Sequence, residues 1–528
     1  MPQFIKPDTL EDLALGAIED HVSQLCVQLM QNKMPESKKV HHAQERCRQL
    51  KYILHCTLPT IIANKMTVKL LKCVDRLYDD IRDSIGESWC QEVIYEVLSA
   101  IIHPGVTRLE LGAEPMHSFD YRYELNFIVF FLFNKLCTMN DLKVIRLGNQ
   151  YRHGVWTHSV RVAESLEEFT SVYKCSNALL EAVAESCKRL KRLHVSWSPN
   201  VTDDSISAIL KLCHLEELSV MGKISQNGLT QLLNGLAENK GCGGRGPQTC
   251  SSQLLSFGCY NISSLHLDLL VEHFPNLVEL KLLCSNECDL TPLKGLKHLQ
   301  GLWLSNIRFT EVKQLLHAIG SQLLYLHLIY AEALDVKFIG EHCSSLNCLH
   351  LIAYDETVPS SEDYAHPCLP GFESVECLHL NFPGISWPQF FLHQCKNVKK
   401  LVVYLRNSSN CGMLERVLRQ TTMSHLEEVY WSPACQFAQN IAQLLMEKCP
   451  NIRVIRPLES VIWSITYINS EICDFMCLVS VPLISCVNGR LVISNKQRSR
   501  DAESLSSSEH SHRRVAVTLA NMPDTTGK

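Results

Sequence analysis

A short apolar pattern recurs along most of the chain. Each copy has an aliphatic residue, two variable residues, a second aliphatic residue, one variable residue and a third aliphatic residue, as in "LVELKL" at 277. Alternating apolar and variable positions are typical of a short strand with one buried face, so we expect one strand in each copy. Fourteen copies, of which those at 166 and 254 are degenerate, begin at residues 106, 142, 166, 190, 215, 254, 277, 299, 323, 346, 375, 398, 426 and 452.

The spacing of these copies indicates a repeat architecture. Eleven of the thirteen intervals are 22 to 29 residues long, and they contain helical patterns such as "TDDSISAILKLC" at 202. A strand-turn-helix unit of this length cannot bury its apolar face alone, so neighbouring units stack into a solenoid. The longest interval, 39 residues, contains the Gly-rich segment "NKGCGGRGPQTCSS", which we expect to form a surface loop.

A cysteine stands three residues before the first aliphatic residue in "CKRLKRLHV", "CSSLNCLHL", "CKNVKKLVV" and "CPNIRVI". This arrangement resembles the cysteine-containing class of leucine-rich repeats. The resemblance implies an α/β solenoid, a leucine-rich-repeat horseshoe whose parallel strands line the concave side, preceded here by a small α-helical domain.

The sequence divides into four parts. Residues 1–100 carry helical patterns and are expected to form an adaptor-binding helical domain, and residues 101–480 form the solenoid of about fourteen repeats. Residues 481–496, which contain most of the segment "LVSVPLISCVNGRLVIS", are expected to cap the last repeat. Residues 497–528 are polar and Ser-rich, so we expect them to be disordered.

Composition narrows the class of protein. With 50 basic and 55 acidic residues the net charge is -5, which argues against a sequence-independent nucleic-acid binder. The start has no apolar signal-peptide region, and no run of eighteen uncharged apolar residues predicts a membrane span. We therefore expect an intracellular protein of the cytoplasm, the nucleus or both.

The 25 cysteines allow a disulfide or zinc interpretation as well as buried thiols. The count is odd, no C-x-x-C pair occurs, and the closest pairs are Cys284/Cys288 and Cys473/Cys477. Reduced thiols acting as small buried hydrophobic side chains fit this pattern better. No phosphate-binding, dinucleotide-binding, zinc-protease or hydrolase motif occurs, so we expect neither an enzyme nor a cofactor.

The variable residues between the strand aliphatics are expected to face solvent on the concave sheet. Three consecutive copies place a histidine there, which is compatible with a metal site, a polar recognition ladder, or exposed residues without function. Because aromatic anchors carry much of the energy of protein recognition, the favoured interpretation is a protein-substrate surface. Its candidate residues are Trp303, Tyr325, His327, His350, His379, Tyr404 and Tyr430.

The opening helical segment, "TLEDLALGAIEDHVSQLCVQL", has more apolar positions than one narrow stripe needs. Val22, Leu25 and Leu29 can be buried in its own domain together with Ile18, while Leu10, Ala14 and Ile18 line an edge at i, i+4, i+8. That edge resembles the elongin-C-binding box of VHL-box proteins. The resemblance implies that Leu10 fills an apolar pocket on elongin C and that the small Ala14 allows close approach. Alanine replaces the commoner cysteine.

A second segment, "LPTIIANKM" at 58, resembles the cullin-2 box, which implies cullin docking through Leu58, Pro59, Ile62 and Met66. The interval between the two boxes is longer than in that family. The same "LP" also begins an F-box, although the acidic residue usual after the proline is absent.

Together these features resemble leucine-rich-repeat substrate receptors of elongin–cullin RING ligases. The resemblance implies a non-catalytic substrate-recognition subunit of a cullin-RING ubiquitin ligase, with elongin C or an F-box adaptor, a cullin and a protein substrate as partners. The alternatives are an F-box-type receptor and a plain leucine-rich-repeat scaffold or inhibitor, in which the opening helices only cap the solenoid.

Overall fold

The computed structural model describes most of the helical domain and the repeats. The described residues are 10–31, 36–85, 87–111, 131–132, 134–147, 160, 163–172, 175–238, 254–284, 288–329, 331–352, 369–382, 386–405, 419, 423–431, 439–457, 484–487 and 490–493. The predicted tail, 497–528, lies outside them.

A parallel sheet runs through the whole repeat region. In the described residues fourteen parallel strands follow one another in chain order, and each begins two residues after the start of one pattern copy. The predicted α/β leucine-rich-repeat solenoid is therefore confirmed, and the two degenerate copies also form strands. The strands are β1 (Arg108–Leu111), β2 (Val144–Leu147), β3 (Glu168–Val172), β4 (Arg192–Thr202), β5 (Glu217–Lys223), β6 (Ser256–Ile262), β7 (Glu279–Cys284), β8 (Gly301–Ser305), β9 (Tyr325–Ile329), β10 (Cys348–Ile352), β11 (Cys377–Phe382), β12 (Lys400–Leu405), β13 (Glu428–Trp431) and β14 (Val454–Pro457).

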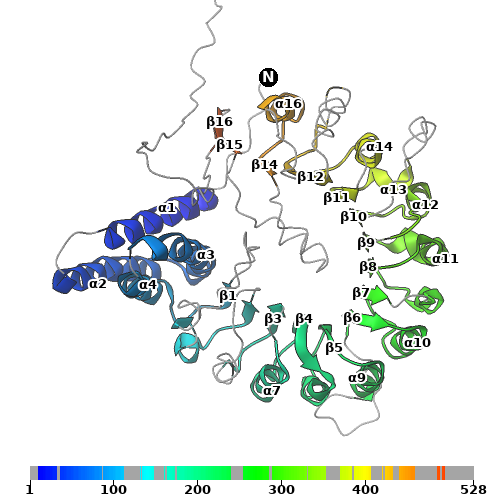
Figure 1. Cartoon of the computed structure of the whole chain (residues 1–528), viewed down its shortest axis with the longest axis horizontal. Coiled ribbons are helices and arrows are strands. Elements are labelled where there is room, and N and C mark those ends of the chain that lie inside the picture. Colours follow the sequence, from blue (N-terminus) through cyan, green and yellow to red (C-terminus); the bar gives the residue numbers. More distant parts are fainter. Residues whose placement is uncertain are drawn as a thin grey trace, which may run out of the picture.

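The helices lie on the outer side of the curve and the strands on the inner side (Figure 1). Within a strand such as β8, Leu302 and Leu304 point to the helices and are 1% and 0% exposed. This alternation puts the residue between them on the concave face. The outer helices are α7 (Asn177–Ser186), α8 (Ile206–Ile209), α9 (Gln226–Glu238), α10 (Ser264–His273), α11 (Phe309–Ile319), α12 (Val336–His342), α13 (Pro370–Glu373), α14 (Ser386–Gln394) and α16 (Gln439–Lys448).

Some repeats replace part of the helix with a 3₁₀ turn. These turns are η2 (Leu136–Thr138), η5 (Asp203–Ser205), η6 (Thr291–Gly295) and η7 (Gly320–Gln322).

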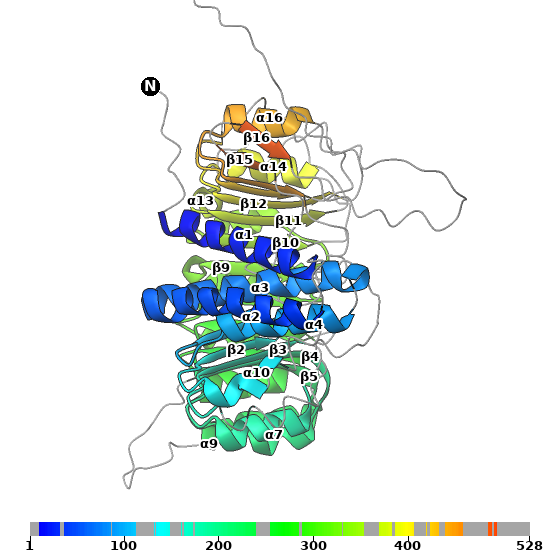
Figure 2. The ribbon, with the colours of Figure 1, turned by 90° about the vertical axis from the view of Figure 1, so that its left-hand side faces the viewer.

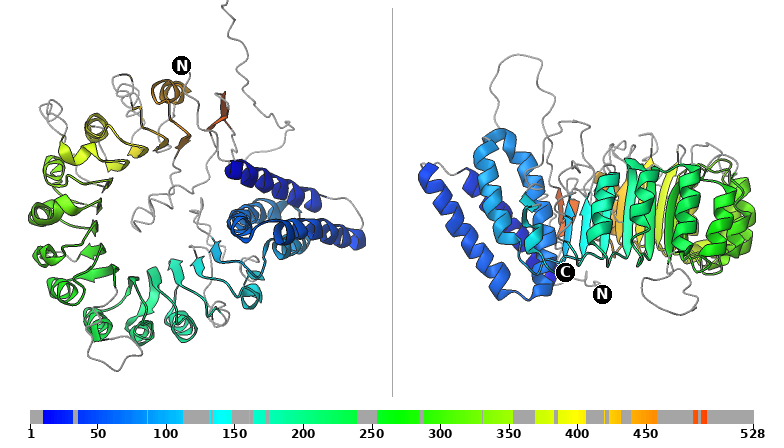
Figure 3. Two further views of the ribbon diagram at one scale, coloured as in Figure 1. Left: turned by 180° about the vertical axis from the view of Figure 1, so that it is seen from behind. Right: turned by 90° about the horizontal axis from the view of Figure 1, so that it is seen from below.

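Four helices and a π-helical turn precede the repeats and pack as a bundle at one end of the solenoid (Figures 2 and 3). Val22, Leu25 and Leu29 of the first helix are buried, as predicted from the apolar pattern. No helix in the described part of the chain is long and apolar enough to cross a bilayer. The elements are α1 (Leu10–Met30), α2 (Glu36–Tyr52), η1 (Ile53–Thr57), α3 (Thr60–Ile85) and α4 (Glu87–Ile101).

The bundle and the solenoid share one core. The main cluster of buried apolar residues runs without interruption from Val22 in α1 to Ile452 before β14. At the junction, the Thr107 amide donates a hydrogen bond to Asn64 Oδ1 of α3 at 3.0 Å, and Thr67 Oγ1 donates to the Ile101 carbonyl at 3.3 Å. The helices thus cover the apolar end of the first repeat.

At the other end, two antiparallel strands extend the sheet beyond β14. They are β15 (Ile484–Val487), which pairs with β14, and β16 (Arg490–Ile493), which pairs with β15. The reversal of direction marks the end of the parallel repeats.

The junction predicts the effect of replacing Asn64 with alanine. The part-buried Thr107 amide then loses its acceptor, so we expect the free energy of unfolding to fall by about 1–2 kcal/mol. Amide hydrogen exchange should become faster at Thr107 and remain slow at Leu193 in β4, which serves as the internal reference. Unchanged exchange at Thr107 would contradict the assigned bond.

Candidate protein-docking surfaces

The predicted concave row is assembled as expected across adjacent strands. Its members are direct cross-strand neighbours in the parallel register, with His350 of β10 between His327 of β9 and His379 of β11. The row consists of Lys281, Trp303, His327, His350, His379, Val402 and Tyr430.

The prediction that this row faces solvent is wrong for all seven of its members. Among the candidate residues, Tyr325, in the neighbouring row, is largely exposed, at 48%, while the side chain of Tyr404 lies outside the described residues. The buried members of the row are Lys281, Trp303, His327, His350, His379, Val402 and Tyr430, with exposed fractions of 7%, 3%, 6%, 6%, 1%, 3% and 4%.

Crowding on the inner side of the curve explains this burial. Adjacent strands are about 4.8 Å apart, and large rings on successive strands fill that spacing and shield one another. The ring centroids of His327 and His350 are 5.2 Å apart, and those of His350 and His379 are 5.0 Å apart. A second apolar cluster of Met221, Trp303, Ile329 and Ile352, separate from the main core, adds to the packing on this face.

His327 and His350 are neutral at pH 7. Burial, together with the charges of His379 and Lys281, lowers the pKa of His327 to about 3, although Cys377 opposes this effect. Burial also holds the pKa of His350 well below its ordinary value. The three rings are tilted by 66° and 56° to one another, and no group of three or more His, Cys, Asp or Glu residues in the described part of the chain is arranged to hold a metal ion.

The concave face has a different chemistry in the first repeats. There Glu110 and Arg146 of the row, together with Glu168 and Arg192 of the neighbouring row, form a ladder of alternating charge, in which Arg192 Nε lies 2.9 Å from Glu168 Oε2. Burial alone would raise the pKa of Glu168, but the hydrogen bonds and charges of the two arginines hold that pKa below its ordinary value. The buried carboxylates of these first repeats are therefore paired with arginines of the same sheet.

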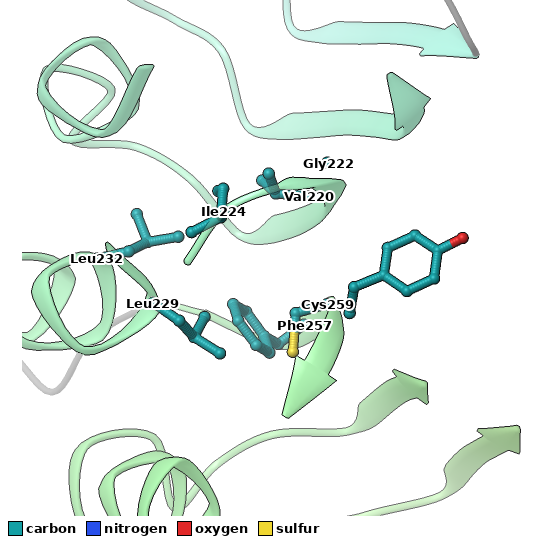
Figure 4. Close-up of a pocket in the computed structure, with 8 residues that line it drawn as sticks. Val220, Gly222, Ile224, Leu229, Leu232, Phe257 and Cys259 are labelled. Carbon is teal, nitrogen blue, oxygen red and sulfur yellow. The ribbon is translucent and has the colours of Figure 1, made fainter. Parts of the chain in front are cut away.

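A small cavity lies behind the concave sheet. The cavity in Figure 4 has a volume of about 10 Å³ and is lined by apolar side chains such as Leu229 and Phe257. That volume holds about one water molecule. The cavity is a packing gap behind β5 and β6.

The cysteines are free thiols in the described residues. Most are buried, including Cys284 and Cys288, while Cys473 and Cys477 lie outside the described residues. Burial raises the pKa of Cys187 to about 12, so that thiol is a poor nucleophile at neutral pH.

The candidate elongin-binding edge lies on α1. Leu10, Ala14 and Ile18 are all helical, but the side chains of Leu10 and Ala14 are outside the described residues. Ile18 is half-buried and packs against the main core.

The candidate cullin-binding residues at the start of α3 separate into two groups. Pro59 and Ile62 are exposed, and Leu58 is half-buried against the core. Met66 is only 2% exposed, so its assignment to a docking surface is wrong. The physical reason is that Met66 lies one turn beyond Ile62 on the side of α3 that packs with Leu70 and Val74 in the bundle.

Sequence reasoning missed three residues of this surface. Tyr52, Ile53 and Ile61 are 64%, 46% and 73% exposed, and they lie beside Pro59 and Ile62 in the sequence. We call Tyr52, Ile53, Pro59, Ile61 and Ile62 the α3 patch. The adjacent Ile61 and Ile62 after Pro59 were the available signal, but the pattern does not reveal which residues at the start of α3 remain exposed.

Lysine side chains flank the α3 patch. Lys51 precedes it and Lys65 follows it, and both are exposed. A partner that presents apolar residues edged by acidic ones would therefore match this surface.

Comparison with known proteins gives only distant likenesses. No family model matches the chain, and no curated protein sequence matches it. Among solved structures, the yeast Rad7–Elc1 complex aligns over 81% of this chain and 94% of that chain, with 13% identity and a TM-score of 0.44. An internalin (inlF) from Listeria monocytogenes aligns over 50% of this chain and 68% of that chain, with 17% identity and a TM-score of 0.28. Likenesses at this level do not extend to function.

The buried histidines predict acid sensitivity. His327 and His350 have lowered pKa values in the folded protein but ordinary ones near 6.5 in the unfolded chain, which therefore binds more protons below that pH. The free energy of unfolding should thus fall as the pH drops below about 6.5, by about 2 kcal/mol per histidine at pH 5. Urea unfolding at pH 7.5, 6 and 5 measures this change.

The matched variant is His350→Asn, which removes one titrating group from the row. Its stability should depend less steeply on pH, by about one proton, over the same range. A wild-type stability that stays constant from pH 7.5 to 5 would contradict the neutral buried row.

The two groups of α3 residues predict opposite effects of truncation. Met66→Ala leaves a cavity in the bundle and should lower the free energy of unfolding by about 2–5 kcal/mol. Ile61→Ala removes an exposed side chain and should change it by less than about 0.5 kcal/mol. Chemical denaturation followed by circular dichroism compares the two. Equal losses would mean that Ile61 is part of the core.

Proposed function

We propose that this chain is the non-catalytic substrate-recognition subunit of a cullin-RING ubiquitin ligase. In this proposal the helices α1 to α4 dock elongin C and a cullin, and the concave face of the solenoid holds a protein substrate. Ubiquitin transfer is then carried out by other subunits, and this chain contributes proximity. We place its activity in the cytoplasm, the nucleus or both.

The observation that carries the proposal is the α3 patch. Four of the eight large hydrophobic side chains exposed in the described residues, Tyr52, Ile53, Ile61 and Ile62, lie within residues 52–62. Exposed apolar residues gathered in one place are typical of protein-binding surfaces. Pro59, Ile61 and Ile62 of the α3 patch lie in the segment that resembles the cullin-2 box.

The position of the patch adds support. The bundle buries residues such as Met66 in the shared core and leaves Ile61 and Ile62 at the start of α3 exposed. A bundle that served only as a cap would gain nothing from exposing Ile61 at 73%. Leu10, Ala14 and Ile18 lie one turn apart on α1, and in this proposal they form a second surface, for an adaptor.

One observation favours the plain scaffold as a second candidate. The shared core of the bundle and the first repeat means that the helices do cap the solenoid. Capping uses the buried residues of α3, such as Met66, and docking uses its exposed first turn, with Ile61 and Ile62, so the two roles are compatible in one domain.

A binding experiment separates these possibilities. The full chain and two variants, Leu10→Ser/Ala14→Phe and Ile61→Asp/Ile62→Asp, are used to capture purified elongin C with elongin B, cullin-2 and the F-box adaptor. We expect the first variant to lose elongin C, because it removes the apolar side chain of Leu10 and replaces the small Ala14 with a large ring. We expect the second variant to lose the cullin, because a buried carboxylate in an apolar contact is costly. Leu265→Asp, at a position of α10 that is 61% exposed, is the matched control and should bind normally.

Other outcomes are equally informative. Capture of the F-box adaptor, lost in the Ile61/Ile62 variant, would move the assignment to an F-box-type receptor. Capture of neither adaptor by the wild-type chain would overturn the ligase proposal and leave a capped repeat scaffold.

A further inference from the structure

We propose that Lys281, Trp303, His327 and His350 form a binding site for an anionic oxygen group, a carboxylate or a phosphate, carried by a protein ligand. This inference depends on the proposed function in one respect: it takes the protein ligand to be the substrate. It assigns a ligand chemistry to one segment of the concave face, from β7 to β10.

The four side chains are consecutive neighbours in one row. Lys281 pairs in register with Trp303, Trp303 with His327, and His327 with His350. All four point away from the helices, because their flanking leucines fill the main core. Their exposed fractions are 7%, 3%, 6% and 6%, so the row has little contact with bulk water.

Three ring nitrogens in this row have no hydrogen-bond partner among the residues that the structure describes. They are Nε1 of Trp303, Nδ1 of His327 and Nδ1 of His350. An indole N–H can only donate, and a buried one normally finds an acceptor. Leaving such groups unsatisfied costs about 1–3 kcal/mol each, so a cluster of them on adjacent strands needs an explanation.

The first repeats differ in how they pair their buried charges. There each buried carboxylate of the concave face meets an arginine, as Glu168 meets Arg146 and Arg192. From Lys281 to His350 the row itself contains no carboxylate. This segment of the row therefore combines a buried ammonium and an indole N–H with two imidazoles, and it has no acidic side chain of its own.

Lys281 gives the site its positive charge, and its partner Glu279 reaches solvent. Its Nζ lies 3.2 Å from Glu279 Oε2, and the side chain of Glu279 is 40% exposed. Glu279 also accepts a hydrogen bond from Ser256 Oγ at 2.8 Å. An incoming anion can therefore compete for the ammonium while Glu279 keeps another donor.

The combination selects the class of ligand. A metal cation is disfavoured by the lysine ammonium, and the indole offers it no lone pair. A purely apolar side chain would leave the ring nitrogens unsatisfied. A carboxylate or phosphate accepts several hydrogen bonds at once and gains charge-assisted contact with Lys281. Its source is a chain terminus, an acidic side chain or a phosphorylated residue of the substrate.

The first experiment detects an acceptor at Trp303. The full chain is labelled with ¹⁵N in the tryptophan indoles, the Trp303→Phe variant identifies the Trp303 signal, and acetate and inorganic phosphate are titrated against matched chloride. We expect the Trp303 indole proton to move downfield with acetate, phosphate or both. No movement beyond the chloride control would overturn the proposal.

Variants test the charge assignment. Lys281→Met should weaken anion binding by about ten- to a hundredfold, and Lys281→Arg should retain it. Glu279→Gln removes the competitor and should strengthen binding by about two- to fivefold. Ser219→Ala, in the same row on β5, is the matched control and should bind as the wild type does. Equal binding by Lys281→Met and the wild type would overturn the site, provided that circular dichroism shows the variant to be folded.

Peptide pools then identify the source of the anion. Randomised peptides are captured with free C-terminal carboxylates, with amidated C-termini and with internal phosphoserine. Loss on amidation assigns the site to a chain terminus, enrichment of phosphoserine assigns it to phosphate, and enrichment of Asp or Glu in both unphosphorylated pools assigns it to acidic side chains. Failure of all three pools would contradict the proposal.

Failure here is distinguishable from failure of the proposed function. The Lys281→Met chain keeps α1 to α4 intact, so it should still capture elongin C if the ligase assignment is right. Adaptor capture without anion binding would overturn only this inference.

Discussion

Stacking is the constraint on which the whole structure depends. One strand and one short helix cannot bury their apolar face, so each repeat is stable only against its neighbours. The result is one core that extends from the bundle to the last parallel strand. The end of such a core would be exposed, and α3 covers it with Met66, Leu70 and Val74. The inward face of α3 is therefore committed to the solenoid, which leaves only its other face and its first turn for a partner.

Stacking also determines the chemistry of the concave face. Because side chains alternate across a strand, the residue between Leu302 and Leu304 must lie opposite the core. Because neighbouring strands keep one register, these residues align in a row. Neighbouring side chains on this face are therefore close together, which favours hydrogen-bonded or ion-paired neighbours. Arg192 and Glu168 form such an ion pair. Trp303 Nε1 and His350 Nδ1, in contrast, have no hydrogen-bond partner among the described residues.

The sequence was sufficient for the fold because the repeat pattern is local and occurs fourteen times. It was also sufficient for the alignment of His327, His350 and His379, which follows from equal positions in successive copies. Exposure could not be predicted in the same way. The burial of Trp303 depends on the curvature of the sheet and on neighbours such as Ile329, from another repeat. These are properties of the assembled solenoid, not of any one copy.

The start of α3 shows a second limit. The motif spacing groups Ile62 with Met66, but the helix buries Met66 and leaves Ile61 exposed beside Ile62. Ile62 and Met66 lie one turn apart on the same face of α3, so the difference arises from position along the helix: Ile62 is in the exposed first turn, whereas Met66, like Leu70 and Val74, is enclosed by the bundle. A helical motif gives the spacing of residues along an element, but packing decides which of them face outward.

The shared core has a consequence for how such a protein would work. If the α3 patch holds the ligase and the row from β7 to β10 holds the substrate, the two surfaces are parts of one packed body, with no flexible linker between them in the described core. The orientation of the substrate relative to the ligase is then set by strand register and by the junction at Asn64. A rigid receptor restricts the lysines that can reach the ubiquitin donor, because effective concentration is high only where the geometry permits contact. In this arrangement the solenoid contributes selectivity at two levels. The ring nitrogens of the row and the Lys281 ammonium select the anionic group that is bound. The stacked repeats determine which part of the substrate is presented.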